Sequence, residues 1–117
     1  MNQSSIKIDV VLDINKIPEQ ISWSATESSA PEPQKAKAMC LAFWDGADRT
    51  AMRIDLWTKD MMVDEMADFY FQMLSGMADT FERATHNKEL GGDMKKFSQE
   101  FQKKFRESQL ANENVSK

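Results

Sequence analysis

The chain has 117 residues and a formal net charge of −4; 41% of its residues are hydrophobic and 29% are charged. This composition is typical of a globular protein, and the length predicts a single domain over residues 1–117. The acidic charge argues against nucleic acid or an anionic membrane as a partner, because either would require a concentrated basic face.

Three features of the sequence predict a cytoplasmic protein. Cys40 is the only cysteine and therefore has no partner for an internal disulfide. The amino terminus, MNQSSIKIDVV, lacks the basic region and apolar core of a signal peptide. No apolar run approaches the roughly 20 residues that span a bilayer, so we expect no direct membrane insertion.

The first half of the chain has the two-residue periodicity of β-strands. Apolar residues occupy every second position from Ile6 to Ile14, which predicts a half-buried strand. A turn beginning at Asn15 leads to a second strand from about Gln20 to Ala25. Residues 26–34, TESSAPEPQ, carry two prolines and no large apolar side chain, so we expect a mobile surface loop.

Residues 35–44, KAKAMCLAFW, are compatible with either a buried strand or a helix. We favour a strand, because DGADR at 45–49 has the character of a hairpin connection. Thr50 to Trp57 then returns with Met52, Ile54 and Leu56 in alternation.

A long amphipathic helix follows, with Asp60 as its expected N-cap and its end near His86 and Asn87. At roughly 100° per residue, one face collects a stripe of apolar side chains. The stripe consists of Val63, Met66, Ala67, Tyr70, Met73, Leu74, Met77, Phe81 and Ala84. We expect this stripe to be buried and to form the centre of the core.

A second helix is expected after Gly91 and Gly92, which should break the chain before Asp93 caps the helix. Its narrow apolar stripe consists of Met94, Phe97, Phe101 and Phe105, and residues 109–117 form a frayed polar tail. The predicted fold class is α+β, with a four-stranded antiparallel sheet followed by two helices. The second helix packs either in its own chain or against another copy, and we expect a homo-oligomer.

Residues suited to catalysis are scarce. His86 and Cys40 are the only histidine and cysteine, and the sequence contains no glycine-rich phosphate loop. Asp60, Asp64 and Asp68 share the spacing of one helix face, but nothing supplies opposing metal ligands. We therefore expect no enzymatic activity, no cofactor and no metal site.

A contact surface is the better-supported kind of site. If Met52, Ile54 and Leu56 point to the core, Arg53, Asp55 and Trp57 point away from it, and Trp and Arg are enriched at interaction hot spots. Phe69 and Phe71 flank the helix stripe and join the candidate interaction residues. Two interpretations of Trp57 remain open, since it could also fold over the helix start as part of the core.

Three blocks, IDLWTKDMMVDEM (54–66), MADTFERAT (77–85) and KAM…WD (37–45), resemble the gliding-motility GldC family of Bacteroidetes. Met62 stands where that family is expected to carry proline, which suits a first helical turn. The resemblance implies a cytoplasmic accessory protein that improves gliding and binds protein partners of the gliding and secretion machinery. It implies no catalytic residues.

The order of four strands and two helices is also similar to that of the export chaperone SecB, without a shared motif. This likeness implies an alternative function as a holdase for exported proteins.

Overall fold

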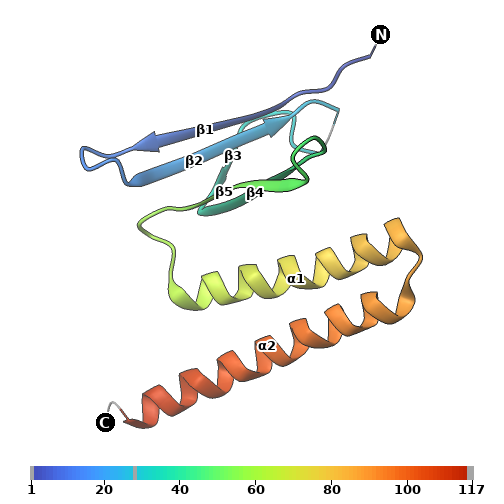
Figure 1. The fold of residues 1–117 in the computed structure, drawn as a ribbon. Helices are drawn as coiled ribbons and strands as arrows, with labels where there is room; N and C mark the ends of the chain where they lie inside the picture. The colour runs from blue at the N-terminus through green and yellow to red at the C-terminus, as the bar shows by residue number, and fades with distance from the viewer. Residues whose placement is uncertain (1, 28, 116–117) are drawn as a thin grey trace. The chain divides into compact units, whose positions relative to one another are not determined.

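A computed structural model describes residues 2–27 and 29–115, which belong to two compact units, residues 1–61 and 62–117. We call them the sheet unit and the helical unit. The sheet unit contains β1 (Ile6–Leu12), β2 (Pro18–Ala25), β3 (Gln34–Ala36), β4 (Ala38–Asp45) and β5 (Thr50–Trp57) (Figure 1). The helical unit contains α1 (Val63–Thr85) and α2 (Lys88–Val115). The single domain over residues 1–117 stays a prediction.

The α+β class is confirmed, but the expected four-stranded sheet is wrong. The strands form a three-stranded antiparallel sheet in the order β1-β2-β3 and a separate two-stranded antiparallel sheet of β4 and β5. The segment expected as one strand over residues 35–44 is extended, as favoured, but it is divided at Lys37. Its first part pairs with β2 and its second part pairs with β5.

Hydrogen bonds at Lys37 explain this division. The Thr58 amide donates to the Lys37 carbonyl oxygen at 2.7 Å, and Thr58 Oγ1 lies 3.0 Å from the same oxygen. Thr58 is 2% exposed, so its hydroxyl requires a partner inside the protein. These contacts fix the end of β5 at the bend where the chain changes its pairing partner.

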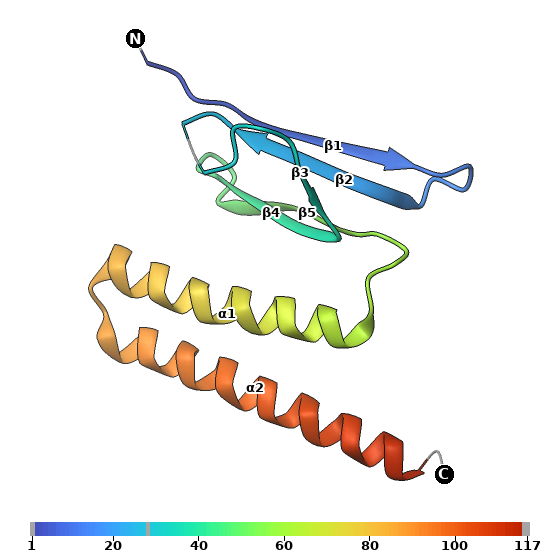
Figure 2. The same ribbon diagram turned by 180° about the vertical axis from the view of Figure 1, so that it is seen from behind.

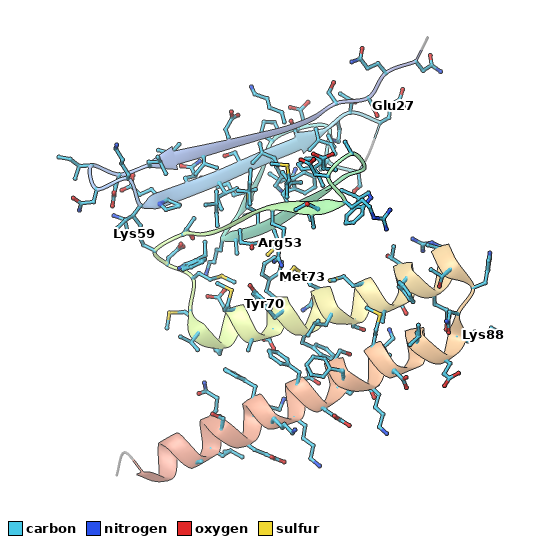
Figure 3. All side chains as sticks on the ribbon, in the orientation of Figure 1. Glu27, Arg53, Lys59, Tyr70, Met73 and Lys88 are labelled. Carbon is cyan, nitrogen blue, oxygen red and sulfur yellow. The ribbon has the colours of Figure 1, made fainter. Side chains whose placement is uncertain are left out.

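The two sheets of the sheet unit form two layers (Figures 1 and 2). Figures 1 and 2 show the β4–β5 hairpin as a second layer beside β1 and β2, and Figure 3 shows Arg53 projecting away from them. The opposite side of the hairpin, which carries Leu41 and Leu56, therefore faces β1 and β2. Ile21 of β2 is 1% exposed and provides the largest buried side chain of this unit.

The connections in the sheet unit differ in detail from the expectation. β1 ends at Leu12 rather than Ile14, which lies in the following turn and is 96% exposed. In the loop expected at 26–34, Ala30 is buried and its carbonyl accepts a hydrogen bond from the Ala25 amide at 2.8 Å. Residue 28 lies outside the described residues, and the mobility of this loop stays a prediction.

The helix α1 begins later than expected, because its N-cap position is Met62 and not Asp60. The Met62 amide donates to the Glu65 carboxylate at 3.2 Å, while the Asp60 carboxylate accepts from the Thr58 hydroxyl at 2.5 Å. The Asp60 carboxylate is therefore bonded within the bend that precedes α1 and does not cap the helix. The helix ends as expected, with His86 in the left-handed conformation (φ 57°) and its amide bonded to the Glu82 carbonyl at 2.8 Å.

The expected chain break at Gly91 and Gly92 is wrong. α2 begins at Lys88, both glycines lie inside it, and the Asn87 side chain accepts a hydrogen bond from the Leu90 amide at 3.0 Å. Asn87 thus takes the capping role expected of Asp93. The tail expected to fray from residue 109 is helical to Val115, and residues 116–117 lie outside the described residues.

The apolar stripe of α1 is only partly covered, against the expectation of a buried core face. Val63 is 70% exposed, Met77 56% and Tyr70 37%, and Ala78, just outside that stripe, is the fully buried apolar residue of α1. The reason is that α2 packs against a neighbouring strip of α1, which includes Ser75 and Ala78.

Candidate interaction surface

One face of the β4–β5 hairpin carries the candidate residues of the sheet unit. The register pairs Trp57 with Ala38, Asp55 with Cys40, Arg53 with Ala42 and Trp44 with Ala51. Directly opposed residues in an antiparallel pair point to the same side of the sheet, so these eight residues share one face. We call it the hairpin face. The structure therefore brings Arg53, Asp55 and Trp57 together.

Large and small side chains stand opposite each other on the hairpin face, and this pairing leaves the large side chains exposed. Each large residue of this face, Trp57, Arg53 or Trp44, stands opposite an alanine, which provides little cross-strand cover. Trp57 is consequently 58% exposed and Trp44 is 64% exposed. Of the two interpretations of Trp57, exposure favours a contact surface over a core position.

Polar contacts organise the side chains on this face. Arg53 Nη2 lies 3.0 Å from an Asp55 carboxylate oxygen, although both side chains remain partly exposed. The Arg49 guanidinium lies 5.9 Å from the centre of the Trp44 ring, within the range of a cation–π interaction. The face thus presents two tryptophans with paired charges, a combination suited to binding a protein surface.

The chemistry of Cys40 does not favour a nucleophilic role. Partial burial raises the pKa of the Cys40 thiol, and the Asp55 carboxylate opposite it adds to this rise. A raised pKa keeps the sulfur protonated, whereas nucleophilic cysteines require the thiolate. Cys40 therefore acts as a small packing residue of the hairpin face.

Phe69 and Phe71 belong to the helical unit. The Phe69 ring packs edge-to-face on Tyr70, with ring centres 6.2 Å apart and an interplanar angle of 86°. Phe71 is half-buried on the side of α1 that contacts α2. The two residues therefore point in different directions from α1 and do not form one patch.

Sequence reasoning missed Trp44 as a member of the hairpin face. The signal was present, because a strand that continues through residue 44 places Trp44 on the same side as Ala38, Cys40 and Ala42. Finding it required the hairpin register, since the apolar run of residues 38–44 shows no polar alternation that distinguishes its two faces.

The three acidic residues expected on one helix face are not all on the helix. Asp60 precedes α1 and contacts Thr58, whereas Asp64 and Asp68 lie within the helix. Among residues 2–27 and 29–115, no group of three or more His, Cys, Asp or Glu side chains is arranged to hold a metal ion. Within the same residues, neither helix is apolar enough along its length to cross a membrane.

Comparison with known proteins agrees with the resemblance seen in the sequence. Residues 18–107 match the family described as gliding motility-associated protein GldC-like. No curated protein and no solved structure gives a significant match. The match covers more than three quarters of the chain, from β2 into the second half of α2. The chain therefore belongs to the GldC-like family of gliding motility-associated proteins.

Proposed function

We propose that this protein is a cytoplasmic, non-enzymatic accessory protein of bacterial gliding motility. In this role it binds protein partners of the gliding and associated secretion machinery through the hairpin face. The family match supports the pathway. The observation that carries the mode of action is the exposed Trp57 beside the Arg53–Asp55 ion pair, on a face with no catalytic constellation among the described residues.

The hairpin face has the composition of a binding hot spot. Tryptophan and arginine contribute large contact areas and directional hydrogen bonds, and alanine neighbours leave both side chains accessible. Removing Trp57 should cost about 2 kcal/mol of binding free energy, or roughly 30-fold in Kd. The fold should survive, because most of this side chain is already in solvent.

The test is an in-cell crosslinking pull-down from a gliding bacterium that carries the tagged wild type, Trp57→Ala or Ile14→Ala. Ile14 is a matched control, since it is 96% exposed in the sheet unit but lies outside the hairpin face. We expect one or two motility components with the wild type and Ile14→Ala, and strongly reduced recovery with Trp57→Ala. Equal recovery with all three proteins, or unfolding of Trp57→Ala, contradicts the proposal.

A holdase function is the second candidate. Phe43, Met52 and Ile54 lie on the same side of the hairpin as Leu41 and Leu56, but β1 and β2 leave them 60%, 61% and 50% exposed, and such side chains can bind unfolded polypeptide. In this case the purified protein would suppress aggregation of an unrelated unfolded protein. It would also recover many export substrates in the pull-down instead of one or two defined components.

A further inference from the structure

The two helices of the helical unit meet along a narrow strip that includes two fully buried small residues. α1 and α2 run antiparallel (Figure 1), and Ala78 and Ser98 are 1% and 0% exposed. A Cβ atom built on Gly91 would lie 2.8 Å from Glu82 Cβ, which shows how closely the helices approach at their connected ends. We call this strip the seam. It continues along α2 through residues at three- and four-residue spacing, namely Lys95, Ser98, Gln102, Phe105 and Gln109.

Polar contacts mark one side of the seam. Lys95 Nζ lies 2.9 Å from an Asp79 carboxylate oxygen and 3.0 Å from Ser75 Oγ, and it crosses from α2 to α1 to do so. Asp79 follows the seam residue Ala78 directly, so it lies about 100° around α1 in one direction. The polar rim of the helical hairpin is therefore on this side.

A row of apolar residues from each helix lies on the other side of the seam. Met77 directly precedes Ala78, and Phe97 directly precedes Ser98, so each lies about 100° from the seam in the direction opposite to Asp79. The same direction of rotation on two antiparallel helices leads to the same side of the pair. Four more apolar residues directly precede a half-buried or buried residue of the seam and therefore lie on the same side, namely Tyr70, Leu90, Met94 and Phe101. Val63, one heptad before Tyr70, extends the row.

This shared surface, which we call the helical face, is poorly covered. Val63, Tyr70, Met77, Leu90 and Phe97 are 70%, 37%, 56%, 48% and 55% exposed. At about 200 Å² for a large side chain, these fractions leave roughly 500 Å² accessible on five residues alone. The half-buried Met94, Phe101 and Met66 extend this area toward the roughly 800 Å² per partner of a standard protein interface.

We propose that the helical face binds the helical face of a second copy of this chain, so that two helical hairpins form a four-helix arrangement. Two antiparallel helices with one apolar side are half of a four-helix bundle. The heptad spacing of Val63, Tyr70 and Met77, and of Leu90 and Phe97, suits packing against another helix. The roughly 500 Å² left accessible on five of its residues is already more than half of the area that one partner contributes to a standard interface.

The experiment is size-exclusion chromatography with light scattering on the full chain at tens of micromolar. The wild type should have twice the 13.4 kDa mass of one chain. Phe97→Lys and Met77→Lys should each return the protein to the single-chain mass, with helical circular dichroism retained. Each is expected to raise the dimer Kd at least about 10-fold, because a buried lysine at the interface lacks a partner.

Leu110→Lys is the matched control. Leu110 is 60% exposed, similar to Phe97, but it follows the seam residue Gln109 and so lies on the polar side of α2. This variant should remain dimeric. Trp57→Ala should also remain dimeric, so that loss of partner binding at the hairpin face can be distinguished from loss of the dimer. If a lysine unfolds the helices, Phe97→Gln and Met77→Gln replace the lysine variants, and we expect the same return from the dimer mass to the single-chain mass.

Three results would overturn the proposal. A wild-type protein of single-chain mass at these concentrations would mean that another surface, in this chain or in a different protein, covers the helical face. A dimer that persists in folded Phe97 and Met77 variants would place the interface elsewhere. Loss of the dimer with Leu110→Lys but not with Phe97→Lys would place it on the polar side of α2.

Discussion

Lys59 Nζ lies 2.6 Å from the Asp13 carboxylate, and this ion pair joins the segment after β5 to the turn between β1 and β2. The Asp13 side chain also accepts hydrogen bonds from the Asn15 and Ile17 amides at 2.8 and 2.9 Å. Only 10% of the Asp13 side chain is exposed. One carboxylate thus shapes the β1–β2 turn and fixes it to the end of the second sheet.

The first prediction concerns the pH dependence of this contact. The Lys59 ammonium and the Ile17 amide hold the pKa of Asp13 below its ordinary value of 3.8. A lowered folded-state pKa stabilises the fold fully above the unfolded-state pKa, and this contribution disappears as the pH falls through the folded-state value. We expect the sheet unit of the wild type to lose stability as the pH falls from about 5 through the ordinary carboxyl pKa and below it, and Asp13→Asn to lose less over the same change.

Tryptophan fluorescence during urea unfolding is the measurement, because Trp23, Trp44 and Trp57 all lie in the sheet unit. Asp9→Asn is the control, since Asp9 pairs with Lys7 at 3.7 Å and both side chains are well exposed. An acid-induced loss that is the same in the wild type and Asp13→Asn would show that the carboxylate does not stabilise the turn in its ionised form.

The second prediction compares two isoleucines. Ile21→Ala removes a side chain that is 1% exposed and should destabilise the sheet unit by about 2–5 kcal/mol, through lost burial and a residual cavity. Ile14→Ala removes the same atoms at 96% exposure and should change stability by less than about 0.5 kcal/mol. The midpoints of urea unfolding followed by tryptophan fluorescence provide the comparison. Similar midpoints for the two variants would place the core of this unit away from Ile21.

Much of the secondary structure followed from periodicity in the sequence. The alternation from Thr50 to Trp57 predicted β5 with its exact ends, and it placed Arg53, Asp55 and Trp57 on one face. The apolar stripe similarly predicted one long helix that ends near His86, although the expected N-cap at Asp60 lies two residues before the observed one at Met62. Side-chain patterns are informative here because each of these elements has one polar and one apolar side.

Features fixed by the backbone could not be predicted in this way. The division at Lys37 depends on the hydrogen bond from the Thr58 amide to a main-chain carbonyl, which leaves no pattern in the side chains. Periodicity also shows that one side of α1 is apolar without showing what covers it. α2 packs beside that stripe, because the small residues Ser75 and Ala78 permit a closer approach than Tyr70 or Met77 would.

Gly91 and Gly92 were expected to break the chain before the second helix, and their positions inside α2 give the third prediction. A Cβ atom on Gly91 would lie 2.8 Å from Glu82 Cβ, whereas a Cβ atom on Gly92 would have no neighbour within 4 Å. Gly91→Ala should therefore force the helices apart and destabilise the helical unit by about 1–3 kcal/mol. Gly92→Ala should stabilise it by roughly 0.5–1 kcal/mol, because alanine loses less backbone freedom in a helix than glycine does.

Thermal unfolding followed by far-ultraviolet circular dichroism is the appropriate measurement, since both helices belong to the helical unit. The two substitutions add the same methyl group at adjacent positions of one helix, so their difference isolates the contact with Glu82. If Gly91→Ala is as stable as Gly92→Ala, the seam is looser than the structure indicates. If both are destabilised, the glycine pair is instead required for the backbone at the start of α2.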